Sequence, residues 1–243
     1  MSVMRAVITG GSSRSGMAIA RAFAARGMDL VLSYRQGEAL ARALADELRE
    51  LGGQVDVHHL ELEDEGSIER FAEAIGSQPV DALVHAAGSF DEQAWGEIDD
   101  QNLMAHYRSN ASGPLLLTQA LSDRLAASAH PAGACVMLFG DIHAEQRPRA
   151  GAASYLLAKS ATHGLVKLLA VELAPVRVLG IAPGVVSWPD DWSAARREAY
   201  LREVPLNRAG TPEDVARLAG ALLEDATYVT GVMLPLDGGR HLR

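Results

Sequence analysis

Two side chains that could exchange a proton, Tyr155 and Lys159, lie four residues apart in an Ala- and Leu-rich stretch, residues 154–174. This stretch predicts one long helix, on which positions i and i+4 share a face. An ammonium beside a phenol favours the phenolate, so we expect Lys159 to lower the pKa of Tyr155 from its usual value of about 10. Such a tyrosine can give or take a proton near neutral pH. The same spacing also occurs in helix surface pairs without chemistry.

A glycine-rich turn, TGGSSRSG at residues 9–16, lies between a β-branched run and a stretch with helical periodicity. Gly10 and Gly16 would let the backbone approach a phosphate, which the free amides of a helix N-terminus also favour. Arg14 strengthens this interpretation, because a cation at a helix N-terminus faces an unfavourable dipole unless an anion is also present. The alternative is an exposed arginine that points into solvent.

The residues after the second predicted strand, Ser33, Tyr34 and Arg35, favour NADP over NAD. Many NAD sites place an acidic residue here for the ribose hydroxyls, whereas Ser33 and Arg35 could hold a 2′-phosphate.

The elements that would position these groups alternate regularly along the chain. Strands are predicted with helical stretches between them, at 3–8, 29–34, 54–60, 80–85, 134–139, 176–181 and 231–235. This order predicts an α/β fold, a single Rossmann-like doubly wound domain over residues 1–243 with a mostly seven-stranded parallel sheet. Ligands should bind at the carboxyl ends of its strands.

Composition excludes several other classes of protein. The net charge of −9 argues against nucleic acid or an anionic membrane surface as the main partner. The single cysteine, Cys135, cannot form an internal disulfide, and the histidines show no spacing typical of a metal site. No stretch has the length of a membrane span or the form of a signal peptide. We therefore expect a soluble, cytoplasmic protein without a metal.

Four motifs together resemble the short-chain dehydrogenase/reductase family in order and spacing. They are the turn TGGSSRSG, Asn110, the pair Tyr155 and Lys159, and IAPG at 181–184. The resemblance covers essentially the whole chain. It implies a nicotinamide cofactor and an oligomer, most often a homotetramer, built partly on the helix that carries Tyr155.

Three residues narrow the resemblance to the pteridine reductases and the bacterial dihydromonapterin reductases. Arg14 replaces a usual glycine, Asp141 replaces the family's usual serine, and Phe90 lies where those enzymes place a ring against the pterin. The C-terminal LPLDGGRHLR is similar to the end of the dihydromonapterin reductases. The chain departs from the family pattern at Ala86 and Leu179, where asparagine is usual, and at the spacing of Asp141 from Tyr155, which is one residue longer than usual.

The resemblance also implies a set of site residues. The catalytic residues would be Asp141, Tyr155, Lys159 and Asn110. NADPH would be bound by Gly10, Ser13, Arg14, Ser15, Gly16, Ser33, Tyr34, Arg35, Glu61, Leu62, Ala86, Ala87, Gly88, Tyr155, Lys159, Pro183, Gly184 and Ser187. The substrate would contact Arg14, Phe90, Asp141, Tyr155 and Trp188, under a lid formed by about residues 185–210.

The carboxyl group of Asp141 separates the candidate reactions. A carboxylate would repel the alkoxide that develops when a carbonyl is reduced, whereas reduction of a ring C=N needs a proton on nitrogen that a carboxyl group can relay. Asp141 therefore favours a nitrogen-rich ring, although aspartate is also a common helix or turn cap. The leading hypothesis is an NADPH-dependent dihydropterin reductase. The alternatives are a carbonyl reductase, for example of 3-oxoacyl thioesters, and a cofactor-binding regulator without turnover.

Overall fold

The computed structural model describes residues 3–243, so the first two residues of the predicted domain lie outside the described part. Its centre is one sheet of seven parallel strands in the order β3-β2-β1-β4-β5-β6-β7. The predicted fold class is confirmed. The strands are β1 (Arg5–Thr9), β2 (Asp29–Tyr34), β3 (Val55–His59), β4 (Ala82–His85), β5 (Cys135–Phe139), β6 (Arg177–Pro183) and β7 (Val232–Leu236).

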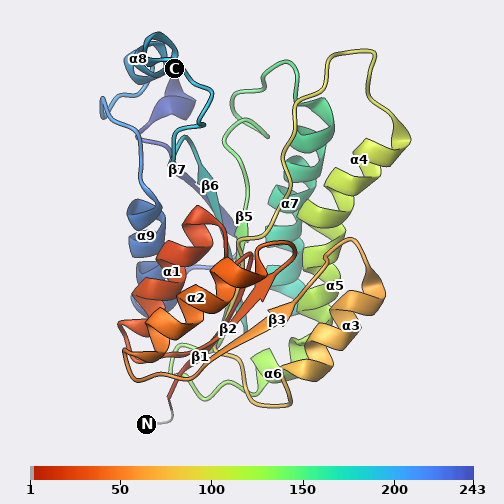
Figure 1. Ribbon diagram of the computed structural model, residues 1–243, viewed down its shortest axis with the longest axis vertical. Coiled ribbons are helices and arrows are strands. Elements are labelled where there is room, and N and C mark those ends of the chain that lie inside the picture. Colours follow the sequence, from red (N-terminus) through yellow and green to blue (C-terminus); the bar gives the residue numbers. More distant parts are fainter. Residues whose placement is uncertain (1–2) are drawn as a thin grey trace.

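Helices cover both faces of the sheet (Figure 1). On one face lie α1 (Arg14–Ala24), α2 (Glu38–Arg49) and α9 (Pro212–Glu224). On the other lie α3 (Glu65–Ala74), α4 (Asp100–Tyr107), α5 (Gly113–Ala120) and α7 (Ala153–Glu172). Shorter elements complete the described chain: the π-helical turn η1 (Arg108–Ser112), α6 (Ser122–Ala126), α8 (Ala194–Arg202) and the 3-10 turn η2 (Arg240–Leu242).

The central strands β1, β4 and β5 are apolar on both faces because helices cover each face. In β1, the side chains of Ala6 and Ile8 join the core beneath α1, α2 and α9, and Val7 joins the core on the opposite face. All three are fully buried. This pattern of continuous apolar runs is typical of parallel sheets and explains why the strands are recognisable from sequence.

Local sequence signals set where the helices begin. The Ser13 side chain caps α1 by accepting a hydrogen bond from the amide of Gly16. At α9, Thr211 and Asp214 form a reciprocal capping box, and Pro212 stands in the first turn, where its missing N–H costs nothing. These caps satisfy backbone N–H groups in the first turns of both helices and so fix where each helix begins.

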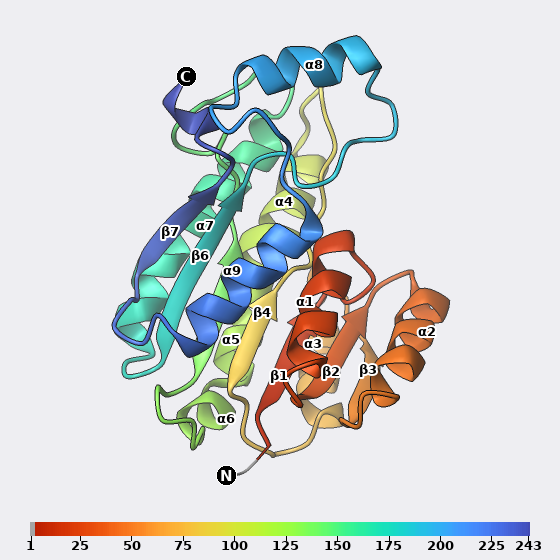
Figure 2. The same ribbon diagram turned by 90° about the vertical axis from the view of Figure 1, so that its left-hand side faces the viewer.

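Strand order reverses direction between β1 and β4, so the loops that follow these strands diverge above the sheet. A crevice at such a point is the usual ligand site of an open α/β sheet. The segment predicted as a lid contains α8, which lies over this end of the molecule beside the C-terminus (Figure 2). No helix within residues 3–243 combines the length and apolar character that crossing a membrane requires.

Candidate active site

Tyr155 and Asp141 meet at the carboxyl end of β5. Tyr155 lies in the first turn of α7, and its hydroxyl donates a hydrogen bond to Oδ2 of Asp141 at 3.0 Å. The other carboxylate oxygen, Oδ1, accepts the backbone N–H of His143 at 2.7 Å. Both oxygens of Asp141 are therefore held, one by the backbone and one by the candidate proton donor.

This geometry reverses the expected direction of the Tyr155 pKa. Burial raises the pKa of Tyr155 well above its ordinary value, and the negative charge of Asp141 raises it further. The prediction that the pKa of Tyr155 lies below its ordinary value is therefore wrong. Burial is the largest cause of the raised pKa, and the Asp141 carboxylate adds to it because it lies within hydrogen-bond distance of the phenol. Tyr155 thus keeps its proton near neutral pH.

Lys159 is buried one turn further along α7. Its Nζ donates to the carbonyl oxygen of Phe139 at 2.7 Å and lies 5.7 Å from the centre of the Tyr155 ring. Burial lowers the pKa of Lys159 to about 8, against an opposing effect of the Asp141 charge. The ammonium is therefore close to titrating under physiological conditions.

Asn110 lies in the π-helical turn between α4 and α5. Its side-chain amide donates to the carbonyl oxygens of Ser89 and His106, each at 3.1 Å. A Cβ on Gly88 would come within 2.6 Å of Asn110 Oδ1 and 3.7 Å of Lys159 Nζ. Both polar groups therefore face the same glycine, and only a residue without a side chain fits between them.

The glycine-rich turn packs closely across the point where strand order reverses. Gly10 has a φ of +64°, and a Cβ there would approach the backbone of Ala87 to 2.8 Å. A Cβ on Gly16 would collide with the carbonyl oxygen of Gly10. The turn therefore forms a backbone cradle at the N-terminus of α1, and this cradle fits the pyrophosphate of a nicotinamide dinucleotide.

Arg14 extends from this cradle to the lid. It donates to Ser187 Oγ at 2.8 Å and to the carbonyl oxygen of Trp188 at 3.2 Å, and it pairs with Asp190 at 3.3 Å. The structure thus joins two predicted cofactor residues, Arg14 and Ser187, to each other. The guanidinium of Arg14 is directed at the lid rather than at the end of β2.

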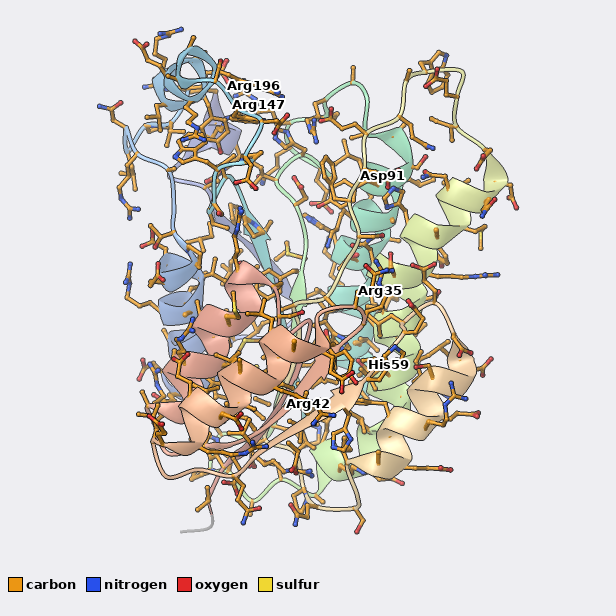
Figure 3. The ribbon with its side chains drawn as sticks, in the orientation of Figure 1. Arg35, Arg42, His59, Asp91, Arg147 and Arg196 are labelled. Atoms are coloured by element: carbon orange, nitrogen blue, oxygen red, sulfur yellow. The ribbon has the colours of Figure 1, made fainter. Side chains whose placement is uncertain are left out.

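The region at the end of β2, which is predicted to hold a 2′-phosphate, carries acidic as well as basic groups. Arg35 lies 3.6 Å from Glu61 and 3.3 Å from Glu63. Figure 3 shows Arg35 on the same side of the molecule as Arg42 and His59, away from Arg147 and Arg196 near α8. Ser33 is buried, and its hydroxyl accepts the Gly10 N–H at 3.2 Å, which joins the end of β2 to the glycine-rich turn.

The other predicted cofactor residues line the ends of the strands. Ala86, Ala87 and Gly88 follow β4, and Glu61 and Leu62 follow β3 with the Leu62 side chain buried. Pro183 ends β6, and Gly184 follows it. Ser13 caps α1, Ser15 lies in its first turn, and Tyr34 ends β2 with its ring edge-on to His59.

Aromatic side chains stand on the substrate side of Tyr155. The ring of Phe90 is 53% exposed and lies 4.8 Å from the Tyr155 ring in an edge-to-face arrangement. In the lid, Trp188, Trp192 and Tyr200 pack together with centroid separations of 5.7 to 5.8 Å. The Tyr200 hydroxyl accepts the N–H of Val185 at 2.8 Å, which ties α8 to the end of β6.

Two histidines near the site were not assigned a role from sequence. His106 is buried with its ring 5.9 Å from that of Tyr155, and its Nε2 lies 2.6 Å from Asp91. His163 is buried beneath Asp141. His106 lies four residues before Asn110 and His163 four residues after Lys159, each on a helical segment. The i, i+4 spacing could therefore have indicated from the sequence that both histidines lie near the site. No cluster of His, Cys, Asp or Glu suited to a metal occurs among residues 3–243.

The chain is similar to known proteins over nearly its whole length. A family model described as enoyl-(acyl carrier protein) reductase matches residues 12–241. The chain is 35% identical to galactitol 2-dehydrogenase (L-tagatose-forming) of Cereibacter sphaeroides, over 96% of this chain and 93% of that protein. It is 30% identical to pteridine reductase 1 of Leishmania tarentolae, over 98% and 96% of the two chains.

Solved structures share the entire fold. A short-chain dehydrogenase/reductase from Burkholderia xenovorans superposes with a TM-score of 0.90 at 25% identity, covering 100% of both chains. A blue fluorescent protein from a metagenomic library, in complex with NADPH, gives a TM-score of 0.88 at 29% identity, covering 98% of this chain and 97% of that one. The chain therefore belongs to the short-chain dehydrogenase/reductase family and is an NAD(P)-dependent oxidoreductase.

Proposed function

We propose that the protein is an NADPH-dependent reductase that converts a dihydropterin, such as dihydromonapterin or dihydrobiopterin, into the tetrahydropterin. The observation that carries this proposal is the hydrogen bond from the Tyr155 hydroxyl to the Asp141 carboxylate, beside the exposed ring of Phe90. A flat heterocycle stacked on Phe90 would gain about 0.5–1.5 kcal/mol beyond its buried area.

The two side chains suit the delivery of a proton to nitrogen. A bound reduced nicotinamide supplies the hydride. Tyr155 holds a proton at neutral pH because burial and Asp141 raise its pKa, and its hydroxyl shares that proton with Asp141 through their hydrogen bond. The pair can give this one proton to a ring nitrogen as the hydride reaches the neighbouring carbon, and the ammonium of Lys159 would offset the negative charge that remains on the pair. Lys159 would hold the nicotinamide ribose, and Asn110 would support Lys159 across Gly88.

The choice of NADPH rests on two observations. A solved structure at 29% identity is a complex with NADPH. Arg35 stands at the end of β2 where a 2′-phosphate would lie. Its partners Glu61 and Glu63 would have to share the guanidinium with that phosphate.

A carbonyl reductase is the second candidate, favoured by the 35% identity to galactitol 2-dehydrogenase. We weigh it below the pterin reductase because Asp141 would place a negative charge beside a developing alkoxide.

We also propose that the protein acts as a homotetramer. The outer face of α7 exposes three large apolar side chains, Leu157, Leu168 and Val171, with exposed fractions of 59 to 78%. An apolar stripe on a long helix is typical of a surface that another protein covers.

The experiment is NADPH oxidation with a 7,8-dihydropterin and a 3-oxoacyl thioester offered in parallel, with NADH as the control cofactor. We expect turnover of the dihydropterin, and a loss of about a hundredfold or more in Tyr155→Phe and Asp141→Ala, with NADPH binding nearly unchanged. Turnover of the thioester alone, or full activity in Asp141→Ala, would refute the pterin assignment.

A further inference from the structure

The backbone of Asp141 is held from below by a histidine. Its N–H donates a hydrogen bond to Nε2 of His163 at 3.3 Å. His163 lies on α7 four residues after Lys159, so it belongs to the same rigid helix as the catalytic pair. Its exposed fraction is only 4%, so the imidazole contacts protein rather than substrate.

The hydrogen bond from Asp141 selects the tautomer of this imidazole, and Glu145 lies beside the other ring nitrogen. Because Nε2 accepts the Asp141 N–H, the proton of the neutral ring must sit on Nδ1. A carboxylate oxygen of Glu145 lies 3.3 Å from that atom. At this distance the carboxylate acts through its charge, because Nδ1 makes no hydrogen bond within the described chain, and that charge favours the tautomer with the proton on Nδ1.

Gly140, which precedes Asp141, allows the His163 ring to approach the backbone closely. A Cβ on Gly140 would collide with Nε2 of His163, so only glycine lets the ring reach the chain where β5 ends. Asp141 is then fixed at three points: its N–H by His163, its Oδ1 by the N–H of His143, and its Oδ2 by Tyr155.

We propose that His163, with the charge of Glu145 beside it, is the positioning residue that keeps the Asp141 carboxylate against the Tyr155 hydroxyl. The segment after β5 is a series of turns without a helix or strand up to residue 152. Its start needs an anchor on a rigid element, and α7 provides one. The consequence for turnover rests on the proposed function, but the effect on Tyr155 does not.

Tyrosinate absorbance during a pH titration tests the positioning directly, with each variant compared with its Tyr155→Phe counterpart to isolate one phenol. In the wild type we expect Tyr155 to stay protonated at pH values at which the other titrating tyrosines have already lost their protons. Asp141→Asn removes the nearby carboxylate, and His163→Leu should let it move away from the Tyr155 hydroxyl, so both should lower the midpoint of Tyr155. His163→Gln should keep the wild-type midpoint, since its amide oxygen can accept the Asp141 N–H. A wild-type midpoint in His163→Leu overturns the proposal.

Turnover provides a second test of the positioning role. The loss of one buried hydrogen bond should decrease the kcat of His163→Leu by about three- to tenfold. The Kd for NADPH should stay unchanged, and His163→Gln should restore the wild-type kcat. In an Asp141→Ala background, His163→Leu should have no further effect. An equal loss in both backgrounds overturns the positioning role.

The proposed function and the positioning role of His163 can be refuted independently. Full dihydropterin turnover in Asp141→Ala refutes the proposed function, whereas the Tyr155 titration still decides the placement of Asp141. If His163→Leu does not fold, Glu145→Ala serves instead, because this side chain is half-exposed. It should lower the Tyr155 midpoint in the same direction, and an unchanged midpoint would count against the proposal.

Discussion

Burial disfavours the charged form of both Lys159 and Tyr155. The phenol therefore keeps its proton, whereas the ammonium tends to lose one. The outcome is an acid with a raised pKa beside a base whose pKa is about 8. Proton supply to the site should therefore depend on the charge of Lys159 rather than on ionisation of Tyr155.

We predict that kcat/KM falls as the pH rises through about 8, because Lys159 loses its charge there. In Lys159→Arg the guanidinium stays charged, so the fall should move to higher pH even though the maximal rate is lower. A pH profile of both proteins under identical buffer and salt conditions checks this. The same descending limb in the arginine variant would assign the titration to another group.

The sequence predicted these residues better than their interactions. The spacing of Tyr155 and Lys159 was sufficient to place both on one helix, and the structure brings Asp141 to within hydrogen-bond distance of Tyr155. The direction of the Tyr155 pKa shift could not be predicted, because it depends on burial and on a hydrogen bond to Asp141. Both arise only when the chain folds, since Asp141 lies fourteen residues before Tyr155 in the sequence. The hydrogen bond from the Gly10 N–H to the buried Ser33 hydroxyl was unpredictable for a similar reason, because it joins two segments that only the fold brings together.

At the scale of elements, Arg14 links the N-terminus of α1 to the lid. Its hydrogen bonds to Ser187 and Trp188 cross more than 170 positions of sequence. The ion pair with Asp190 adds little, because both side chains are largely exposed. The hydrogen bonds therefore contribute most of this link.

We predict that Arg14→Ala loosens the lid. Loss of these hydrogen bonds should speed amide exchange in residues 186–192 by about three- to tenfold and raise the KM for substrate. Arg21→Ala is the matched control, since Arg21 lies on the same helix and pairs with Glu47 on α2 instead of with the lid. Hydrogen exchange followed by mass spectrometry checks both variants. Equal protection of the lid in all three proteins would show that Arg14 does not restrain it.

At the scale of the whole molecule, all seven predicted strands are present, with differences of a few residues at their ends. The helix predicted over 154–174 runs from Ala153 to Glu172. Agreement is good because apolar strands buried on both faces and amphipathic helices leave strong patterns in sequence. The ends differ because capping and local hydrogen bonds decide them, as at Pro183, where β6 pairs further with β7 than predicted.

One buried histidine should make the fold sensitive to acid. His85 donates from Nε2 to Thr118 at 2.8 Å, and burial lowers its pKa to about 3 from an ordinary value of 6.5. Between these values the unfolded chain binds a proton that the folded chain excludes. The stability from neutral His85 is thus fully present above pH 6.5 and is lost as the pH falls toward 3.

We predict that the wild type loses about 2–3 kcal/mol of unfolding free energy from this group at about pH 4.5. His85→Gln keeps a donor for Thr118 but cannot be protonated, so its stability should depend less on pH. Urea unfolding at neutral and acidic pH measures the two slopes. Parallel slopes would mean that other groups cause the acid sensitivity.

The proposed homotetramer can be tested on the same molecule. Leu168→Glu combined with Val171→Glu places two charges on the outer face of α7 and should reduce the assembly to smaller species. Leu51→Glu is the control, because Leu51 is similarly exposed at the end of α2. Sedimentation velocity distinguishes the species, and an unchanged assembly in the double variant would place the interface elsewhere.

The lid also has a spectroscopic consequence. Two of the three tryptophans, Trp188 and Trp192, lie in it, whereas Trp95 is 90% exposed elsewhere. In a Trp95→Phe variant, all indole fluorescence would therefore come from the lid. Reduced nicotinamide absorbs where indole emits, so its arrival beneath the lid should quench that emission by resonance energy transfer. The protein thus carries an internal optical reporter of cofactor binding that needs no added label.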